Sequence, residues 1–289
     1  KTKVITITTV VMALTNVFFD YTLIFGHFGF KTYGIAGAAI ASVIAEITAC
    51  IFFIVYTLKF GSYKYYGLFS FHRFSFSLFK RIFVVSFPMM MQNFISFIGW
   101  FFFFLFVEKM GEHSLAISNV IRSIYVVMLI PIWGFTSAAN TLVSYMIGQS
   151  RQKEVIPLIF KILKLALLGV FVLVLFNMIF PEIIISIYTN NQQLIADAKP
   201  ALYIVSVASL FLTIGFVFFS GVSGTGMTKI SFLIETVVIF IYVLLTYVFV
   251  NVSFANIALV WSVEIFYGII IGVLSILYLR YGKWHHKHI

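Results

Sequence analysis

The sequence predicts an all-α polytopic membrane protein, and three observations support this fold class. Of its 289 residues, 62% are hydrophobic and only 10% are charged, whereas a soluble domain is roughly half apolar and roughly a quarter charged. The apolar residues form long runs, and a helix needs about 20 such residues to cross the hydrocarbon core of a bilayer. These runs lack the alternating pattern of a barrel strand and are about twice its length.

Charged and turn-forming residues divide the apolar runs into eight predicted membrane-spanning helices. In order, the predicted helices cover residues 4–25, 34–58, 82–107, 115–147, 155–180, 201–222, 230–250 and 257–279. Each is bounded by a short segment that holds charges, glycine or asparagine, such as 108–114 and 148–154. The fourth helix is the longest, so we expect it to tilt, to kink at Pro131 or to extend beyond the membrane.

The basic residues predict how these helices are oriented. Cytoplasmic segments of membrane proteins are rich in lysine and arginine. With the N-terminus inside, Lys31, Lys109 and Lys199 fall in outer segments and Arg122 falls within a helix, while the rest of the 19 lysines and arginines fall in inner segments. Both termini are therefore predicted to be cytoplasmic. The net charge of +10 is interpreted as loop charge facing an anionic membrane surface, not as a nucleic-acid-binding surface.

Cysteine and histidine give no indication of a disulfide framework or a metal site. Cys50 is the single cysteine and lies in an apolar run, which excludes both a disulfide and a cysteine-based metal site within the chain. His285, His286 and His288 stand together near the C-terminus, but no acidic or cysteine partner is near them. We interpret them as part of a basic cytoplasmic tail, and we expect no cofactor.

An acidic residue in the first predicted helix is the sharpest functional candidate. Asp20 follows Asn16 by four residues, so both side chains fall on one helix face, one turn apart. Their oxygens can bind Na⁺, and the carboxylate alone can bind and release a proton. Ionisable groups in hydrocarbon cost several kcal/mol and are by default functional. The alternative is that Asp20 reaches the outer interface near Gly26 or caps nearby backbone groups.

Four stretches of sequence carry a family resemblance. The first comprises NVFFDY at 16–21, LIFG at 23–26 and GIAGAAIAS at 34–42; the second comprises the segment 87–92, GEHSLA at 111–116 and NVIRS at 119–123. The third comprises PIWGF at 131–135, AANTLV at 138–143 and IGQ at 147–149, and the fourth is SGVSGTGMT at 220–228. Together they resemble the multidrug and toxic compound extrusion (MATE) transporters.

The resemblance implies a fold of twelve helices in two lobes of six, of which this chain matches helices 5–12. Residues 1–58 would then be the end of the N-terminal lobe, 59–81 a cytoplasmic inter-lobe loop, and 82–289 the C-terminal lobe with the basic tail. We interpret the loop as an amphipathic segment on the membrane surface. Because the sequence begins with Lys1, we expect an N-terminally truncated chain; a native eight-helix protein is the alternative.

The resemblance also implies a cation site. In one MATE branch, an Asn-x-x-x-Asp pair on the fifth helix and a threonine on the sixth belong to such a site, which here assigns Asn16, Asp20 and Ser42. Serine keeps the hydroxyl, but the site's other acidic partner would lie on the first helix of the family. Another branch has a glutamate on the seventh helix, eight residues after its proline. Here that position is Ser96, which puts a second cation site of that type in doubt.

The remaining polar residues within the predicted helices are candidates for substrate binding. They are Glu46, Gln92, Asn93, Ser96, Asn119, Glu235 and Glu264. Glu235 and Glu264 are expected to face each other or Arg122, for which we favour a structural pairing with a carboxylate or carbonyl group. The alternative is that Asn119, like the amide and hydroxyl residues of the third helix, forms hydrogen bonds that link neighbouring helices.

The expected function is that of a cation-coupled antiporter. The resemblance implies export of amphipathic, often cationic drugs or toxic compounds in exchange for H⁺ or Na⁺, by a multi-pass, monomeric protein of the bacterial inner membrane. The alternative is a flippase of lipid-linked oligosaccharides or lipids from the same superfamily, which would need more basic residues than the helices contain. An enzyme is not expected, because the sequence shows no clustered nucleophile, histidine base or metal-binding triad. A channel is disfavoured because no pore or filter motif is repeated.

Overall fold

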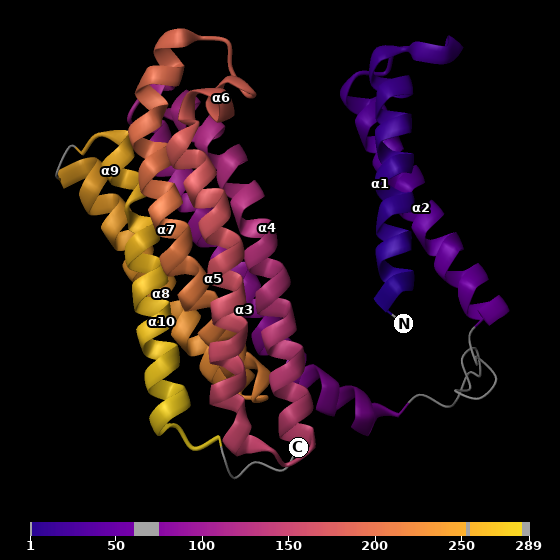
Figure 1. Ribbon diagram of the computed structural model, residues 1–289, viewed down its shortest axis with the longest axis vertical. Coiled ribbons are helices and arrows are strands. Elements are labelled where there is room, and N and C mark those ends of the chain that lie inside the picture. The colour runs from indigo at the N-terminus through magenta and orange to yellow at the C-terminus, as the bar shows by residue number, and fades with distance from the viewer. Residues whose placement is uncertain (1, 61–74, 253–254, 285–289) are drawn as a thin grey trace. The chain divides into compact units, whose positions relative to one another are not determined.

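The computed structural model describes residues 2–60, 75–252 and 255–284, and these residues form helices and no strand (Figure 1). Eight of the described helical segments are long and apolar enough to cross a membrane, so the predicted fold class is confirmed. The chain divides into two compact units, Lys1–Phe74 and Ser75–Ile289. Most of the predicted inter-lobe loop and the tail histidines His285, His286 and His288 lie outside the described residues. The assignment of the units to two lobes stays a prediction.

The first unit is a pair of packed helices, α1 (Thr2–Phe25) and α2 (Ile35–Phe60), which lie side by side (Figure 1). A short 3-10 turn, η1 (His27–Gly29), follows Gly26, whose φ of 75° is the left-handed conformation that glycine adopts without strain. Gly37 of α2 lies so close to α1 that an added Cβ would be 2.6 Å from the carbonyl oxygen of Leu23. The two helices therefore touch backbone to backbone at this point.

The second unit is a bundle of the remaining helices. They are α3 (Phe76–Glu108), α4 (Glu112–Gly148), α5 (Val155–Ile179), α6 (Pro181–Ser186), α7 (Gln192–Gly224), α8 (Thr228–Tyr247), α9 (Ile257–Trp261) and α10 (Val263–Tyr281), with a 3-10 turn η2 (Gln152–Glu154) and a π-helical turn η3 (Val248–Val252). Helix α7 packs against α4, α5 and α10 and is the most deeply buried of the membrane-length helices. Its surroundings form the main hydrophobic core.

Two helices begin earlier than the hydropathy pattern predicts. Helix α3 begins at Phe76 instead of residue 82, because the hydroxyl of Ser75 accepts a hydrogen bond from the first turn. Helix α7 begins at Gln192 instead of residue 201, because the side chain of Asn191 accepts hydrogen bonds from two backbone amides of that turn. Pro200 lies inside α7 and does not end it. Lys80 and Arg81 separate the first turn of α3 from the apolar run that follows, and Gln192, Gln193, Asp197 and Lys199 make the beginning of α7 polar, so hydropathy alone places both beginnings too late.

The short helix α6 was not predicted from the sequence. It begins with Pro181, a residue suited to the first helical turn because its missing N–H needs no partner there. The carboxylate of Glu182 accepts a hydrogen bond from Lys199 Nζ at 2.5 Å, which ties α6 to α7. The ammonium group of Lys199 holds the pKa of the exposed Glu182 carboxyl below its ordinary value.

Glycine allows α7 and α10 to cross in close contact, and we expect Gly268→Ala to destabilise the bundle. A Cβ on Gly268 would be 2.7 Å from the backbone carbon of Phe211 and 2.8 Å from the nitrogen of Leu212. Backbone atoms cannot move aside cheaply, and overpacking typically costs about 1–3 kcal/mol. The measurement is the melting temperature of the purified protein in detergent.

Gly134→Ala is the matched control for this substitution. Gly134 lies inside α4, and a Cβ there would meet no atom within 4 Å. Alanine is favoured over glycine in a helix by about 1 kcal/mol, so this variant is expected to melt at the wild-type temperature or slightly above it. Equal melting temperatures for the two variants would contradict the close crossing of α7 and α10.

Candidate functional site

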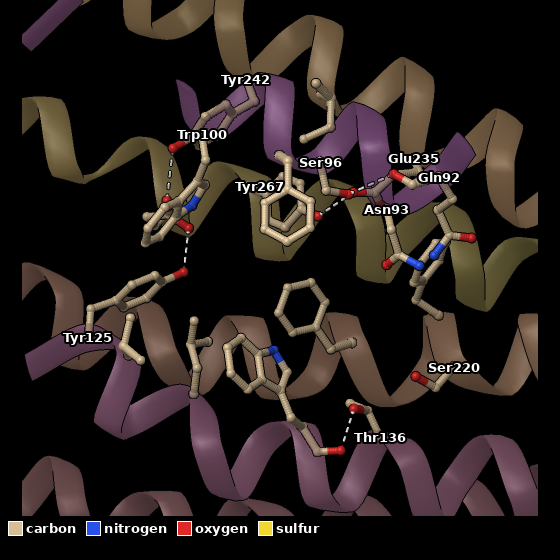
Figure 2. Close-up of a pocket in the computed structure, with 18 residues that line it drawn as sticks. Gln92, Asn93, Ser96, Trp100, Tyr125, Thr136, Ser220, Glu235, Tyr242 and Tyr267 are labelled. Atoms are coloured by element: carbon tan, nitrogen blue, oxygen red, sulfur yellow. Dashed lines mark hydrogen bonds between the residues drawn. The ribbon is translucent and has the colours of Figure 1, made fainter. Parts of the chain in front are cut away.

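The second unit contains a cavity of about 530 Å³ between its helices. Helices α3, α4, α7, α8 and α10 contribute its lining, part of which is labelled in Figure 2. The lining residues are Gln92, Asn93, Ser96, Phe97, Trp100, Tyr125, Val126, Leu129, Trp133, Thr136, Phe216, Phe219, Ser220, Glu235, Ile239, Tyr242, Glu264 and Tyr267. A mostly apolar cavity with a few convergent polar groups is typical of a small-molecule site.

Glu264 of α10 is held by two tyrosines. Tyr242 donates to Oε1 at 2.9 Å and Tyr125 donates to Oε2 at 2.7 Å, so each carboxylate oxygen receives one phenolic hydroxyl. Figure 2 shows Tyr125 and Tyr242 reaching toward the same part of the cavity from opposite sides. The glutamate is 2% exposed. The ring of Tyr125 is in turn stacked on Trp100, with centroids 5.7 Å apart, which fixes its position.

Glu235 of α8 has an asymmetric environment. Ser96 from α3 and Tyr267 from α10 both lie within hydrogen-bond distance of Oε1, at 2.5 and 2.8 Å. The other oxygen, Oε2, is buried and meets no hydrogen-bond donor among the described residues. The side chain as a whole is 2% exposed. Figure 2 shows Glu235 beside Ser96 and Gln92, and Gln92 also has a buried oxygen without a described partner.

No basic side chain neutralises the two glutamates within the part of the chain that the structure describes. The ion pairs in that part join other residues, and no lysine, arginine or histidine is among the cavity-lining residues. Aromatic rings of tryptophan, tyrosine and phenylalanine make up much of the remaining wall. Carboxylates and aromatic faces both attract organic cations, so the site suits a positively charged, partly apolar molecule.

The structure gathers five of the seven sequence-predicted substrate-binding candidates in this cavity. Gln92, Asn93, Ser96, Glu235 and Glu264 line it together. The other two lie elsewhere: Asn119 is exposed on α4 and does not line the cavity, and Glu46 is exposed on α2 in the first unit. The binding roles themselves stay predictions.

The expected pairing of Arg122 with a carboxylate or carbonyl group is not found among the described residues. Arg122 is exposed on α4, and its guanidinium lies 5.0 Å from the centre of the Phe104 ring as a cation–π contact. Neighbouring positions of α4, Ile121 and Tyr125, face inward. Arg122 lies at the edge of this inward-facing stripe and is exposed, and the glutamates hydrogen-bond to hydroxyl groups instead.

The three residues of the predicted cation site lie in the first unit. Asn16 and Asp20 are half-buried on α1, one turn apart as the spacing indicated. The Oδ1 atom of Asp20 is buried and has no hydrogen-bond donor among the described residues. Ser42 is exposed on α2, and its hydroxyl donates to the carbonyl oxygen of Ala38 at 3.0 Å. An uncompensated buried oxygen costs free energy, and the binding of a cation by these three residues stays a prediction.

Sequence reasoning missed the tyrosines of the cavity, although the spacing held a signal. Tyr242 follows Glu235 by seven residues, and Tyr267 follows Glu264 by three. Each buried acid therefore shares a helix face with a phenol. The chain has 15 tyrosines, and only the packing of helices selects these as the partners.

Membrane-length helices around a mostly apolar cavity with a few polar groups are the architecture of a polytopic membrane protein. The model of the MatE family matches residues 88–248, more than half of the chain. The chain therefore belongs to the MATE family.

A relative found by sequence and solved structures with a similar fold are consistent with this family assignment. The probable multidrug resistance protein NorM of Thermotoga maritima is 26% identical over 283 residues, which cover 94% of this chain and 58% of that protein. The outward-facing structure of a multidrug resistance MATE family transporter of the MOP superfamily matches with a TM-score of 0.82 at 20% identity, over 95% of this chain and 61% of that one. A MATE crystal structure in the straight conformation gives 0.81 at 20% identity, over 95% and 61%. The chain thus spans about three fifths of the length of these relatives.

Proposed function

We propose that this protein is part of a cation-coupled multidrug efflux antiporter, which exports amphipathic, often cationic organic compounds by alternating access. The observation that carries the proposal is the aromatic cavity of the second unit, with two buried glutamates and no basic residue in its described lining. Such a cavity attracts an organic cation by charge and by contact with ring faces. The names of the relatives, which refer to multidrug resistance, support the same substrate class.

The coupling ion would bind at Asp20, with Asn16 and Ser42 as further oxygen donors. Binding of H⁺ or Na⁺ there neutralises a buried charge and thereby favours one of two conformations of the transporter. Coupling requires only that the drug and the ion differ in affinity between these two states. Release of the ion on the inner side resets the cycle. No cofactor, enzymatic step or nucleic acid takes part.

The proposal places the protein in the bacterial inner membrane as a multi-pass monomer with both termini in the cytoplasm. The positive-inside distribution of lysine and arginine supports this orientation. Among the described residues, the large exposed side chains of the membrane-length helices are mostly apolar, as a lipid-facing surface requires.

A flippase of lipid-linked oligosaccharides or lipids is the second candidate. Its substrate would present a pyrophosphate or phosphate, which proteins bind with arginine, lysine and backbone amides. The cavity lining offers two carboxylates and no basic side chain. Like charges repel, so this lining favours the export of organic cations.

Dye export from proteoliposomes tests the proposal. The complete gene product is reconstituted, loaded with rhodamine 6G and subjected to an imposed H⁺ gradient or an imposed Na⁺ gradient. We expect export well above that of empty liposomes under one of the gradients, and the effective gradient identifies the coupling ion. Absence of export under both gradients would count against an antiporter, and translocation of lipid-linked sugars would be assayed next.

A further inference from the structure

The two glutamates of the cavity differ in how their oxygens are satisfied, although both are almost fully buried. At Glu264, each oxygen accepts one phenolic hydroxyl, and the described residues offer no other acceptor to Tyr125 or Tyr242. Both tyrosine protons therefore point at the carboxylate. Two donors aimed at two separate oxygens stabilise the ionised form. The ionised form of Glu264 is therefore better satisfied by hydrogen bonds than that of Glu235.

At Glu235, both hydroxyls meet the same oxygen, and Oε2 has none among the described residues. An ionised carboxylate with one bare, buried oxygen is costly, because nothing replaces the lost water. The cost disappears when a proton binds the carboxylate or when a cation lies against Oε2. Oε2 of Glu235 is therefore the carboxylate oxygen of the cavity that is available to bind a proton or a cation.

Ser96 serves both protonation states of Glu235. Its hydroxyl lies 2.5 Å from Glu235 Oε1 and 3.0 Å from the backbone carbonyl oxygen of Gln92. A hydroxyl has one proton and two lone pairs. It can donate to an ionised Glu235, or it can turn its proton to the Gln92 carbonyl and accept the proton of a neutral Glu235. No such second acceptor is available to the tyrosines of Glu264.

The groups that face Glu235 leave its charge uncompensated. The polar groups of α3 in this lining are Ser96, Gln92 and Asn93, those of α4 are Tyr125 and Thr136, and from α10 Tyr267 hydrogen-bonds to Glu235 while Glu264 lies with its tyrosines beyond it; apart from Glu264 all of them are uncharged. Helix α7 contributes Phe216, Phe219 and Ser220 to the same lining, all of them neutral.

We propose that Glu235 is the residue of this cavity at which a proton and the organic cation exchange, while Glu264 remains ionised and attracts the cation throughout. The exchange is balanced: one proton adds to one carboxylate oxygen of Glu235, and one monovalent cation leaves the cavity. The part of this inference that concerns the organic cation depends on the proposed function. The assignment of the proton to Glu235 does not, since it follows from the hydrogen-bonding geometry.

Infrared difference spectroscopy of the complete protein tests the proton assignment without any substrate. A protonated carboxyl group gives a C=O stretching band that disappears as the group ionises during a pH titration. The band of Glu235 is the one that E235Q lacks while bands of other carboxyl groups, such as that of Asp20, remain; we expect E264Q to keep the Glu235 band and S96A to keep it with a displaced midpoint. A band that is present in E235Q and missing in E264Q, or a midpoint unchanged in S96A, would overturn the assignment.

Binding of rhodamine 6G, followed by fluorescence polarisation over the same pH range, tests the exchange. Competition between one proton and one cation weakens wild-type binding by up to about tenfold per pH unit. We expect E235Q to bind weakly with less than about twofold dependence on pH, and E264Q to bind more weakly than wild type but with the full pH dependence. Wild-type pH dependence in E235Q would overturn the exchange. If the wild type binds no dye while the infrared band still depends on Glu235, the proposed function fails and the proton assignment holds.

Discussion

Replacing Asp20 with asparagine is expected to abolish gradient-driven export by the complete transporter while leaving the protein folded. Asparagine has nearly the same shape but carries no charge and cannot exchange a proton. Asp20 has one buried oxygen without a donor among the described residues, and a bound cation would satisfy that oxygen. Without that ion, the two conformations no longer respond to the gradient. We expect rhodamine 6G export to fall by about tenfold or more, to the rate of empty liposomes.

Asp197→Asn is the matched control. This aspartate lies on α7, exposed, and pairs with His113 at 2.9 Å. Exposed ion pairs contribute about 1 kcal/mol or less, so the same chemical change there should leave export within about twofold of wild type. The melting temperatures of both variants establish that they are folded. Wild-type export by Asp20→Asn under both H⁺ and Na⁺ gradients would contradict the role of Asp20 in coupling.

The spans of this protein were predictable because the bilayer imposes one simple requirement. A run of about 20 apolar residues is needed wherever a helix crosses, and eight such runs became eight membrane-length helices. The beginnings of α3 and α7 were not predictable from hydropathy. They depend on Ser75 and Asn191, whose side chains cap the first turns, and a capping signal is local and weak beside the apolar pattern.

The members of the candidate site were predictable one by one, but their arrangement was not. Rarity of charge in hydrocarbon singled out Glu235 and Glu264. Their partners Ser96 and Tyr125 lie 139 residues away in the sequence, and only the packing of α3 and α4 against α8 and α10 brings them together. The surroundings of Arg122 could not be predicted for the same reason, because its depth in the helix could be inferred but not the direction of its side chain.

Removing both hydroxyls that bind Glu264, by the double substitution Tyr125→Phe and Tyr242→Phe, is expected to cause the largest loss of stability. Phenylalanine preserves the rings, including the stacking of Tyr125 on Trp100, and removes only the two donors. A hydrogen bond to a charged group contributes about 1.5–3 kcal/mol. The two substitutions together are therefore expected to lower the free energy of unfolding by about 3–6 kcal/mol. Unfolding in mixed micelles with increasing dodecyl sulfate measures this quantity.

A double-mutant cycle with Glu264→Gln distinguishes the hydrogen bonds from simple packing. If the hydroxyls act by stabilising the charge of Glu264, the two tyrosine substitutions should cost much less in the Glu264→Gln background, since a neutral amide needs its donors less. Tyr247→Phe, at an exposed tyrosine at the end of the same helix α8, controls for loss of a phenolic hydroxyl and should change stability by less than about 0.5 kcal/mol. Equal costs in both backgrounds would mean that Glu264 is not held as an anion, and the fixed charge that attracts the organic cation would have to be sought at another residue of the cavity.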